Sequence, residues 1–380
     1  MNIRVFQKIN DIPATEWNLL VRNNNPFLKH EFLVALETQG CVGQQSGWLP
    51  CHIAVFQNDE LKTAMPLYKK YNSSGEFVFD YAWADAYIKH DLNYYPKLVS
   101  AIPYTPAMGQ RFLCHPDDES KYIPLLLDAC LSLAKEIGAS SLHCLFPDKN
   151  THQTLQNCGL INRYDCQFYW HNPGYQSFDD FLQKLTSRKR KNIKQERRKV
   201  RNAGITFRIL DGRTATSDDW QNFTHFYEKN HIDKWNTPKF NHGFFTQVAN
   251  TLAEQIVLVL ADHEGRCVAG ALMYRSDTHL YGRHWGALEQ FDALHFEACY
   301  YQGIEYCIRE NLQCFEPGVQ GEHKIARGFI PTRTVSNHWI SDLRFAGAIE
   351  NYCKQEKTAV DNYISGLESS IPYRKNEETE

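Results

Sequence analysis

The chain has 380 residues, enough for two folded domains, and with 43% hydrophobic and 22% charged residues it has the composition of an ordinary globular protein. Its formal net charge is only −3, so positive charge is not spread over the whole surface. Twelve cysteines occur without a Cys-x-x-Cys pair, and no segment has the roughly 18 apolar residues of a membrane span, so we expect a cytoplasmic protein without membrane insertion or bound metal.

The first half of the chain begins with a predicted β-hairpin, whose strands at 52–56 and 61–68 flank a polar turn. Residues 76–83 alternate like a further strand, and residues 94–102 have helical spacing. An apolar run at 140–146 predicts a buried strand. A short helix at 151–158 ends at Gly159, and a strand at 167–171 follows.

The second half repeats this plan. Strands are predicted at 255–261, 267–274 and 279–285, then a helix at 295–309, a strand at 314–316, a short helix at 321–327 and a last strand at 334–340. Val55 lies 204 positions before Val259, and Trp83 lies 202 positions before Trp285, which indicates an internal repeat. Hairpins that lead into strand–helix–strand units predict an α/β fold with mixed sheets in each half.

The positive charge is concentrated at residues 187–201, which contain nine basic residues and one acid. Ser177 is a predicted N-cap, and apolar residues such as Ile193 and Val200 share one side of the following helix, or pair of helices broken near residue 186. Such a patch attracts phosphate or another polyanion. We therefore expect an N-terminal domain at 1–172, a C-terminal domain at 173–353 preceded by a basic helix at 177–203, and a polar tail at 354–380.

The densest polar cluster lies late in the chain, at 316–331, where glycines alternate with charged residues after a strand. Lys324 and Arg327 lie three residues apart and would hold a phosphate or a developing oxyanion. Glu322 and His323 are candidate general bases, and Gln320 is a candidate substrate contact. The alternative is an ordinary solvated helix start.

Two neighbouring elements carry further candidates. Tyr281, Arg283 and Trp285 would share one face of the strand at 279–285 as substrate contacts, while glycines on the other face admit a close backbone or a flat ligand. A strand packed tightly against a helix explains the glycines equally well. His295 and Glu297 open the next helix, either as bases or as simple helix-start residues.

In the first half, carboxylates alternate with aromatic rings between residues 80 and 87. Aromatic faces beside carboxylates resemble the wall of a polar-ligand site, although a tyrosine-rich core is the alternative. The candidate substrate contacts are Asp80, Trp83, Asp85 and Tyr87. The chain contains no nucleophile elbow, P-loop, Rossmann fingerprint or His-Glu-x-x-His helix, which disfavours the enzyme classes that use them.

Five stretches together resemble the FemAB-like N-acyltransferase family of the GNAT superfamily, over roughly residues 2–342. They include Leu280-Tyr-Gly-Arg-His-Trp-Gly286 and Gly318-Val-Gln-Gly-Glu-His-Lys-Ile-Ala-Arg-Gly328, and the others are 75–87, 187–193 and 294–297. The resemblance implies two tandem GNAT-like domains and the transfer of an acyl or aminoacyl group to an amine, in a family labelled for peptidoglycan biosynthesis. Lys324 looks like the basic residue that Fem-type enzymes carry in the corresponding loop.

The chain departs from an ordinary acetyl-CoA-binding GNAT domain before the second-half helix, where residues 288–295 contain no glycine. The helical arm of several tRNA-using Fem enzymes is also not visible in the sequence. The donor is therefore open between an acyl-CoA and an aminoacyl-tRNA.

These observations predict a cytoplasmic N-acyltransferase with its substrate in a groove between the two domains. An amine would attack the donor carbonyl while Glu322, His323, Glu297 or His295 takes its proton. Lys324 and Arg327 would stabilise the oxyanion or hold phosphate, and the residues that steer the anionic donor would be Arg188, Arg190 and Lys191. The alternatives are a nucleic-acid-binding protein that uses residues 187–201, and a non-catalytic GNAT-like scaffold for a cell-wall precursor.

Overall fold

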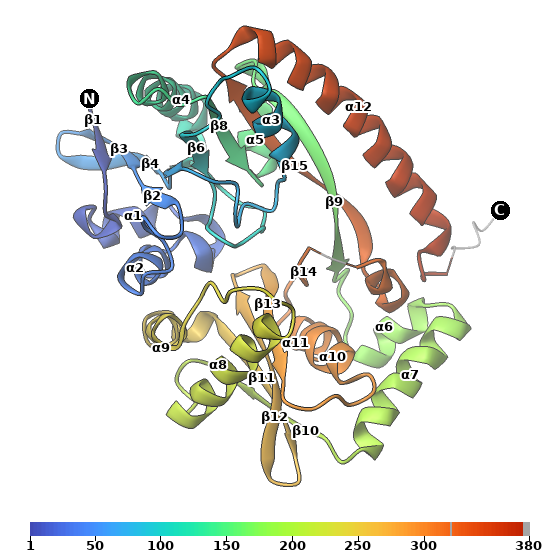
Figure 1. Cartoon of the computed structure of the whole chain (residues 1–380). Coiled ribbons are helices and arrows are strands. Elements are labelled where there is room, and N and C mark those ends of the chain that lie inside the picture. The colour runs from blue at the N-terminus through green and yellow to red at the C-terminus, as the bar shows by residue number, and fades with distance from the viewer. Residues whose placement is uncertain (320, 375–380) are drawn as a thin grey trace. The chain divides into compact units, whose positions relative to one another are not determined.

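The structure, a computed structural model, describes residues 1–319 and 321–374 (Figure 1). The chain forms two compact units, one of Met1–Cys166 with Arg333–Tyr363 and the other of Gln167–Thr332 with Ile364–Glu380. This division differs from the predicted domains at 1–172 and 173–353. Strand β15 (Ile330–Ile340) leaves the second unit and pairs through Ser336–Ile340 with β8 (Ser141–Leu145) of the first.

The first unit contains two sheets. A small sheet has the strand order β1-β3-β4-β7, and a larger one contains the order β15-β8-β6-β5-β2. β6 and β8 run parallel, whereas the other registered pairs of these sheets are antiparallel. The remaining strands are β1 (Asn2–Phe6), β2 (Trp48–Pro50), β3 (His52–Gln57), β4 (Glu60–Met65), β5 (Tyr68–Lys70), β6 (Lys97–Ser100) and β7 (Leu113–Cys114).

Helices cover these sheets. The buried side of α4 (Glu119–Glu136) packs against β3, β4, β6 and β8 and forms a core with residues such as Ile53, Leu98 and Leu142. The other α-helices are α1 (Ala14–Leu19), α2 (His30–Thr38), α3 (Tyr81–Ile88), α5 (Lys149–Asn157) and α12 (Leu343–Leu367). Short 3-10 turns are η1 (Ile9–Asp11), η2 (Arg22–Asn24), η3 (Pro26–Leu28) and η4 (Pro116–Asp118), and η8 (Glu368–Ser370) follows α12.

The second unit contains a sheet with the order β10-β11-β12-β13-β14-β9. Residues Ile256–Ala261 of β11 are all buried, as expected of a strand that is covered on both faces. The strands are β9 (Ile161–His171), which begins in the first unit, β10 (Thr206–Leu210), β11 (Ile256–His263), β12 (Arg266–Arg275), β13 (His279–Ala287) and β14 (Cys314–Glu316).

Figure 1 shows α8 and α9 on one face of this sheet and α7, α10 and α11 on the other. A Cβ atom added to Gly286 would lie 2.1 Å from the Phe226 carbonyl oxygen, so glycine is what allows α8 to approach β13 this closely. The helices are α6 (Phe178–Lys184), α7 (Ser187–Asn202), α8 (Ser217–Ile232), α9 (His242–Thr251), α10 (Leu294–Phe296), the π-helical turn η6 (Glu297–Tyr301), α11 (Gln302–Arg309), and the 3-10 turns η5 (Ala253–Gln255) and η7 (Glu322–Arg327).

The mixed α/β fold class is confirmed, and so are most strands of the predicted repeat. Both hairpins, β3–β4 and β11–β12, are present, and each carries a register shift. The predicted basic helix consists of α6 and α7, and the Ser177 hydroxyl accepts the Asp180 N–H as an N-cap. The repeat fails at its tryptophans, because Trp83 lies on helix α3 while Trp285 lies on strand β13.

Two elements of the first half were predicted with the wrong type. Part of the predicted strand at 76–83 is helix α3, because Trp83 and Tyr87 lie four apart and both are buried on one side of it. The predicted helix at 94–102 contains the strand β6 instead. All four residues of β6 are buried, and such a strand shows no polar alternation that would distinguish it from a helix.

The predicted polar tail at 354–380 is also corrected as far as it is described, because α12 continues to Leu367. Phe345, Ile349 and Cys353 recur every four residues and are buried, which fixes the first half of the helix. Ion pairs from Glu356 to Arg163 and from Lys357 to Asp361 accompany the second half. No helix of the described residues is long and apolar enough to span a bilayer.

Candidate functional site

A cavity of about 150 Å³ opens in the second unit where β13 passes the end of β14. β13 pairs with β14 only as far as Tyr281 and Glu316, although β13 itself continues to Ala287. Pro317 follows β14 and has no backbone N–H to extend the pairing. The two strands therefore part beyond this point, and Gly282 and Pro317 line the opening between them.

A β-bulge in β13 shapes the floor of the cavity. Leu272 of β12 lies opposite His284, but Met273 lies opposite Gly282, so Arg283 is the extra residue of the bulge. The predicted strict alternation of Tyr281, Arg283 and Trp285 is therefore interrupted. Arg283 and Trp285 both line the cavity, whereas the buried Tyr281 does not.

The opposite wall comes from the helix after β13. Residues His295, Cys299 and Tyr300 of this helix line the cavity. Glu297–Tyr301 form a π-helical turn, and such turns are frequent at functional sites because they change which side chains face one way. The His295 ring lies 5.4 Å from both the Trp285 ring and the Tyr300 ring, so the two walls meet at this histidine.

The late polar cluster lies beside this wall. His323 Nε2 is 2.9 Å from the Tyr300 hydroxyl, and Lys324 Nζ donates a 2.6 Å hydrogen bond to the Gly318 carbonyl. Gly318 has a φ of +98° and Gly321 a φ of +105°, values that favour glycine and allow the loop to turn back under Lys324. The loop thus brings a lysine next to the cavity although the lysine is only 2% exposed.

Burial and nearby charge alter the ionisation of these groups. Burial, and after it the positive charge of Arg283, lowers the pKa of Lys324 to about 7. Burial and the neighbouring His323 lower the pKa of His295 to about 4, so that His295 is neutral at neutral pH. The pKa of His323 is also lowered, mainly by burial. The site therefore pairs a neutral histidine with a lysine that exchanges its proton near neutral pH.

Other predicted site residues take part in ion pairs. Glu297 is 3% exposed and pairs with Arg197, whose Nη2 lies 3.0 Å from the carboxylate. Arg327 Nη2 lies 2.7 Å from Glu196, and its guanidinium stacks 3.4 Å from the centre of the Phe296 ring. The first pair connects the helix of the cavity wall to α7, and the second connects η7 to α7. Glu322 is exposed and does not line the cavity, and Gln320 lies outside the described residues.

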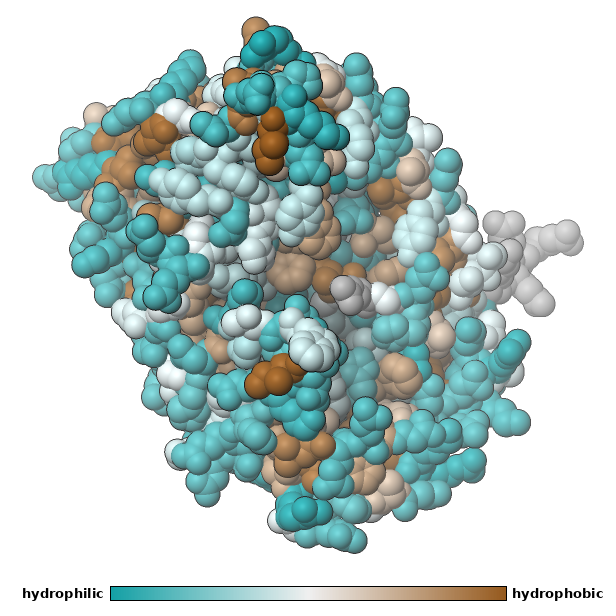
Figure 2. Space-filling model, viewed as in Figure 1, coloured by the Kyte–Doolittle hydropathy of each residue, from teal (hydrophilic) through white to brown (hydrophobic). Residues whose placement is uncertain are grey.

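The basic helix α7 has a buried side and an open side. Ile193 and Val200 face the core, and Arg197 binds Glu297 and Glu305. Arg188 and Lys191 are exposed, Arg190 is partly buried, and none of the three has an ion-pair partner among the described residues. Figure 2 shows that the surface over α6 and α7 is mostly hydrophilic. The open side is suited to a phosphate-rich ligand.

The four predicted contacts of the first half lie in the first unit. Asp80 is buried, where it bonds Lys97 and accepts a 2.6 Å hydrogen bond from the Tyr94 hydroxyl. Trp83 and Tyr87 belong to an apolar cluster with Phe345, and Asp85 is exposed. None of these four residues lines a described cavity of either unit.

Sequence reasoning did not identify Cys299, Tyr300 or Pro317 as site residues, although all three line the cavity. The position of Pro317 directly after a predicted strand was a usable signal for strand divergence. The π-helical turn that turns Tyr300 toward His295 has no comparable signature in one sequence. No group of three or more histidine, cysteine or acidic residues in the described parts of the chain is placed to hold a metal ion.

The profile of the FemAB-like family, described as peptidoglycan biosynthesis/recognition, matches residues 8–375. No curated protein matches the sequence. Among solved structures, FemX is similar with a TM-score of 0.55 and 12% identity, over 92% of this chain and 100% of FemX. The C-terminal domain of a putative lysylphosphatidylglycerol synthetase from Agrobacterium fabrum is similar with a TM-score of 0.54 and 8% identity. The match covers 91% of this chain and 96% of that domain. A Bacteroides thetaiotaomicron protein of unknown function is similar with a TM-score of 0.53 and 10% identity, over 89% of this chain and 99% of that protein.

Proposed function

Because the chain belongs to the FemAB-like family, we propose that it transfers an acyl or aminoacyl group to an amine and that the second-unit cavity is where the acyl group reacts. The observation that carries the proposal is that Arg283 and His295 line this cavity, where β13 and β14 part, and that Lys324 lies close enough for the charge of Arg283 to lower its pKa. The description of the family favours a peptidoglycan precursor as the source of the amine.

The reaction requires an amine nitrogen to attack the carbonyl carbon of an ester or thioester. The new C–N bond forms, the C–O or C–S bond breaks, and the amine proton passes to the leaving oxygen or sulfur. Neutral His295 is suited to accept this proton, directly or through water, because it lines the cavity and one of its two ring nitrogens is unprotonated. His323 could assist through its contact with Tyr300.

Negative charge develops on the carbonyl oxygen during this attack. Lys324 in its protonated form and Arg283 are two buried cations beside the cavity, and their interaction with an oxyanion would be strong because both are removed from water. Burial, and after it repulsion between these two cations, lowers the pKa of Lys324. An oxyanion between them would relieve that repulsion, so the transition state would bind more tightly than the ground state.

The open side of α7 supports a donor with several phosphates. Lys191, Lys194, Arg198 and Arg201 recur at helical spacing and are all exposed. The stripe extends over about 15 Å at 1.5 Å per residue, which is longer than one pyrophosphate and suits a nucleic-acid backbone. We therefore favour aminoacyl-tRNA over acyl-CoA as the donor.

The proposal is tested by offering the purified chain both donor classes, charged tRNAs and acyl-CoAs, with peptidoglycan precursors as the amine. Mass spectrometry should detect one aminoacyl group added to the acceptor. The Lys324→Ala variant should lose transfer while it remains folded, and Lys239→Ala, which alters an exposed lysine of the same unit, should keep it. If the chain binds tRNA in a salt-sensitive way but transfers no group from either donor class, a nucleic-acid-binding protein would be favoured instead.

A further inference from the structure

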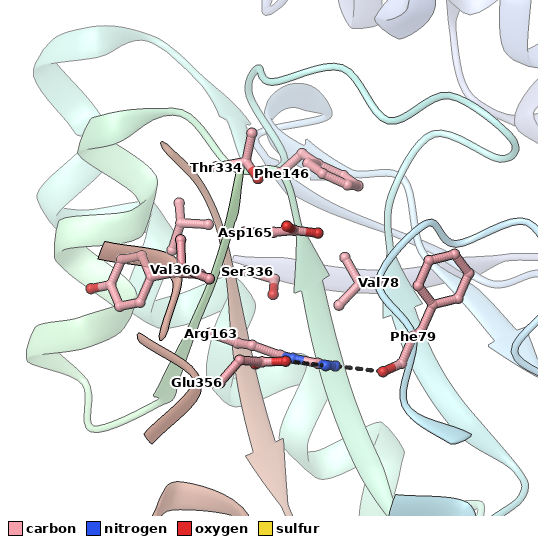
Figure 3. A pocket seen from close by; sticks show the side chains of 11 residues that line it. Val78, Phe79, Phe146, Arg163, Asp165, Thr334, Ser336, Glu356 and Val360 are labelled. Atoms are coloured by element: carbon pink, nitrogen blue, oxygen red, sulfur yellow. Dashed lines mark hydrogen bonds and ion pairs between the residues drawn. The ribbon is translucent and has the colours of Figure 1, made fainter. Parts of the chain in front are cut away.

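The first unit has a cavity of its own, also about 150 Å³, between β9, β15, α12 and the loop that carries Val78 and Phe79 (Figure 3). Its walls include the aromatic rings of Phe79, Phe146 and Tyr164. Figure 3 shows Asp165, Ser336 and Arg163 on one side of it, facing Val78 and Phe79.

Of the charged residues that line this cavity, Arg163 and Glu356 form an ion pair, and Asp165 is the remaining carboxylate. Arg163 forms two hydrogen bonds to Glu356, of 2.7 and 2.8 Å, and a third of 2.7 Å to the Phe79 carbonyl, so three of its five N–H donors are already engaged. Asp165 accepts a 2.7 Å hydrogen bond from the Cys166 N–H and has no ion-pair partner within the described part of the chain. Burial raises the pKa of Asp165 more than these neighbours lower it. Asp165 is itself exposed, and the nearby cation Arg163 is already balanced by Glu356, so the charged groups of this wall leave one net negative charge.

The orientation of the Ser336 hydroxyl follows from a chain of hydrogen bonds that begins at a backbone carbonyl. The Ser140 hydroxyl donates to the Tyr94 carbonyl, so the Ser140 oxygen accepts from the Ser141 hydroxyl at 3.2 Å. The Ser141 oxygen can then only accept from His143, whose Nε2 is 2.7 Å away. The Tyr94 hydroxyl donates to Asp80 and likewise presents its oxygen to this nitrogen, at 3.3 Å. His143 thus carries its hydrogen on Nε2.

The chain continues through a second histidine. Burial lowers the pKa of His143 to about 3 and holds that of His338 well below its usual value, so both rings are neutral and carry one N–H each. His143 Nδ1 must accept the hydrogen of His338 Nδ1, across 2.5 Å. His338 Nε2 is then an acceptor, and the Ser336 hydroxyl donates to it at 2.8 Å. Only lone pairs of Ser336 remain to face the cavity.

Asp165 and Ser336 therefore present acceptors to the cavity, while Arg163 is engaged by Glu356 and the Phe79 carbonyl. A wall with an unbalanced carboxylate, an acceptor hydroxyl and aromatic rings matches a ligand that donates hydrogen bonds and is positively charged. We propose that the first-unit cavity binds a primary ammonium group, with Asp165 and Ser336 as its hydrogen-bond acceptors. The proposal concerns a site separate from the second-unit cavity and does not depend on acyl transfer.

Ligand-observed NMR with three probes of the same carbon skeleton tests this site: pentylammonium, 1-pentanol and pentanoate. Pentylammonium should bind the full-length protein at least tenfold more tightly than 1-pentanol, and pentanoate should not bind. Equal binding of pentylammonium and 1-pentanol, or a preference for pentanoate, would overturn the proposal. This comparison uses only the unaltered chain, so it does not depend on the folding of any variant.

Two variants locate the binding. Asp165→Asn should weaken pentylammonium binding at least tenfold, and Ser336→Ala should weaken it several-fold. Asp128→Asn, which alters an exposed carboxylate on α4 of the same unit, should leave it unchanged. Ammonium binding that persists unaltered in Asp165→Asn would show that the probe binds elsewhere and would refute the assignment.

Discussion

Lys324 donates its 2.6 Å hydrogen bond to the carbonyl of Gly318, and the positive φ of that glycine turns the loop so that the two residues meet. A lysine held in this way is removed from water and faces Arg283 rather than a carboxylate. Its pKa of about 7 is the result, and it makes the loop sensitive to pH in the range where the enzyme would act.

The pH dependence of stability should report this lysine directly. An unfolded chain keeps Lys324 protonated up to its usual pKa near 10.5, whereas the folded chain releases the proton near 7. Between these values the unfolded state binds more protons, so Lys324 makes the folded state more stable as the pH rises. The Lys324→Met variant should lack this contribution. Urea unfolding at pH 7 and pH 9.5 measures it, and an identical pH dependence in both proteins would show that the pKa of Lys324 is not lowered.

Glu297 should prove to support the cavity wall rather than transfer a proton. Its carboxylate is buried against Arg197, so Glu297→Gln should leave that arginine short of a partner and lower the free energy of unfolding by about 1–3 kcal/mol. The pH profile of kcat/KM should keep its shape. If Glu297→Gln lost turnover while its free energy of unfolding stayed unchanged, Glu297 would instead be the general base.

Gly286 tests the packing that positions β13. An alanine there would bring its Cβ within 2.1 Å of the Phe226 carbonyl oxygen, and that atom belongs to helix backbone that cannot easily move. We expect Gly286→Ala to destabilise the protein by about 1–3 kcal/mol. Gly347→Ala on exposed α12, where nothing lies within 4 Å of the new methyl group, is the matched control and should be neutral or slightly stabilising. Thermal unfolding of the two variants compares them.

The open side of α7 should determine donor affinity through phosphate contacts. Each of Lys191→Ala and Arg198→Ala should weaken tRNA binding and lower the slope of log K against log salt concentration by about one. Lys135→Ala, an exposed change on α4, should do neither. Titrations at several salt concentrations provide the slopes, and unchanged slopes in both α7 variants would remove this helix from the donor site.

Part of this structure could be predicted from the sequence because it depends on patterns of residues that are close together in the chain. The late cluster around Lys324 combined glycines with clustered charge after a strand, and Arg283 and His295 stood out as polar groups between apolar elements. Arg283 and His295 line the cavity, and Lys324 lies near Arg283 beside it. The N-cap at Ser177 and the break before α7 were also visible, because capping depends on residues only three positions apart.

The remainder depended on contacts between distant parts of the chain. The buried strand β6 was mistaken for a helix because Lys97 within it is neutralised by Glu76 and Asp80, which lie 21 and 17 residues away. The return of β15 to the first unit depends on its pairing with β8, almost 200 residues earlier. Neither the π-helical turn that directs Tyr300 nor the histidine pair behind Ser336 leaves a local pattern that a single sequence reveals.

Mass-detected aminoacyl transfer tests the central claim most directly, with the unaltered chain, Lys324→Ala and Lys239→Ala compared under the same conditions. The account predicts a product carrying one added aminoacyl group from the unaltered chain and from Lys239→Ala. It predicts at least a hundredfold lower rate from folded Lys324→Ala, as expected when a group that stabilises an oxyanion is removed. An unchanged rate from Lys324→Ala would contradict the account.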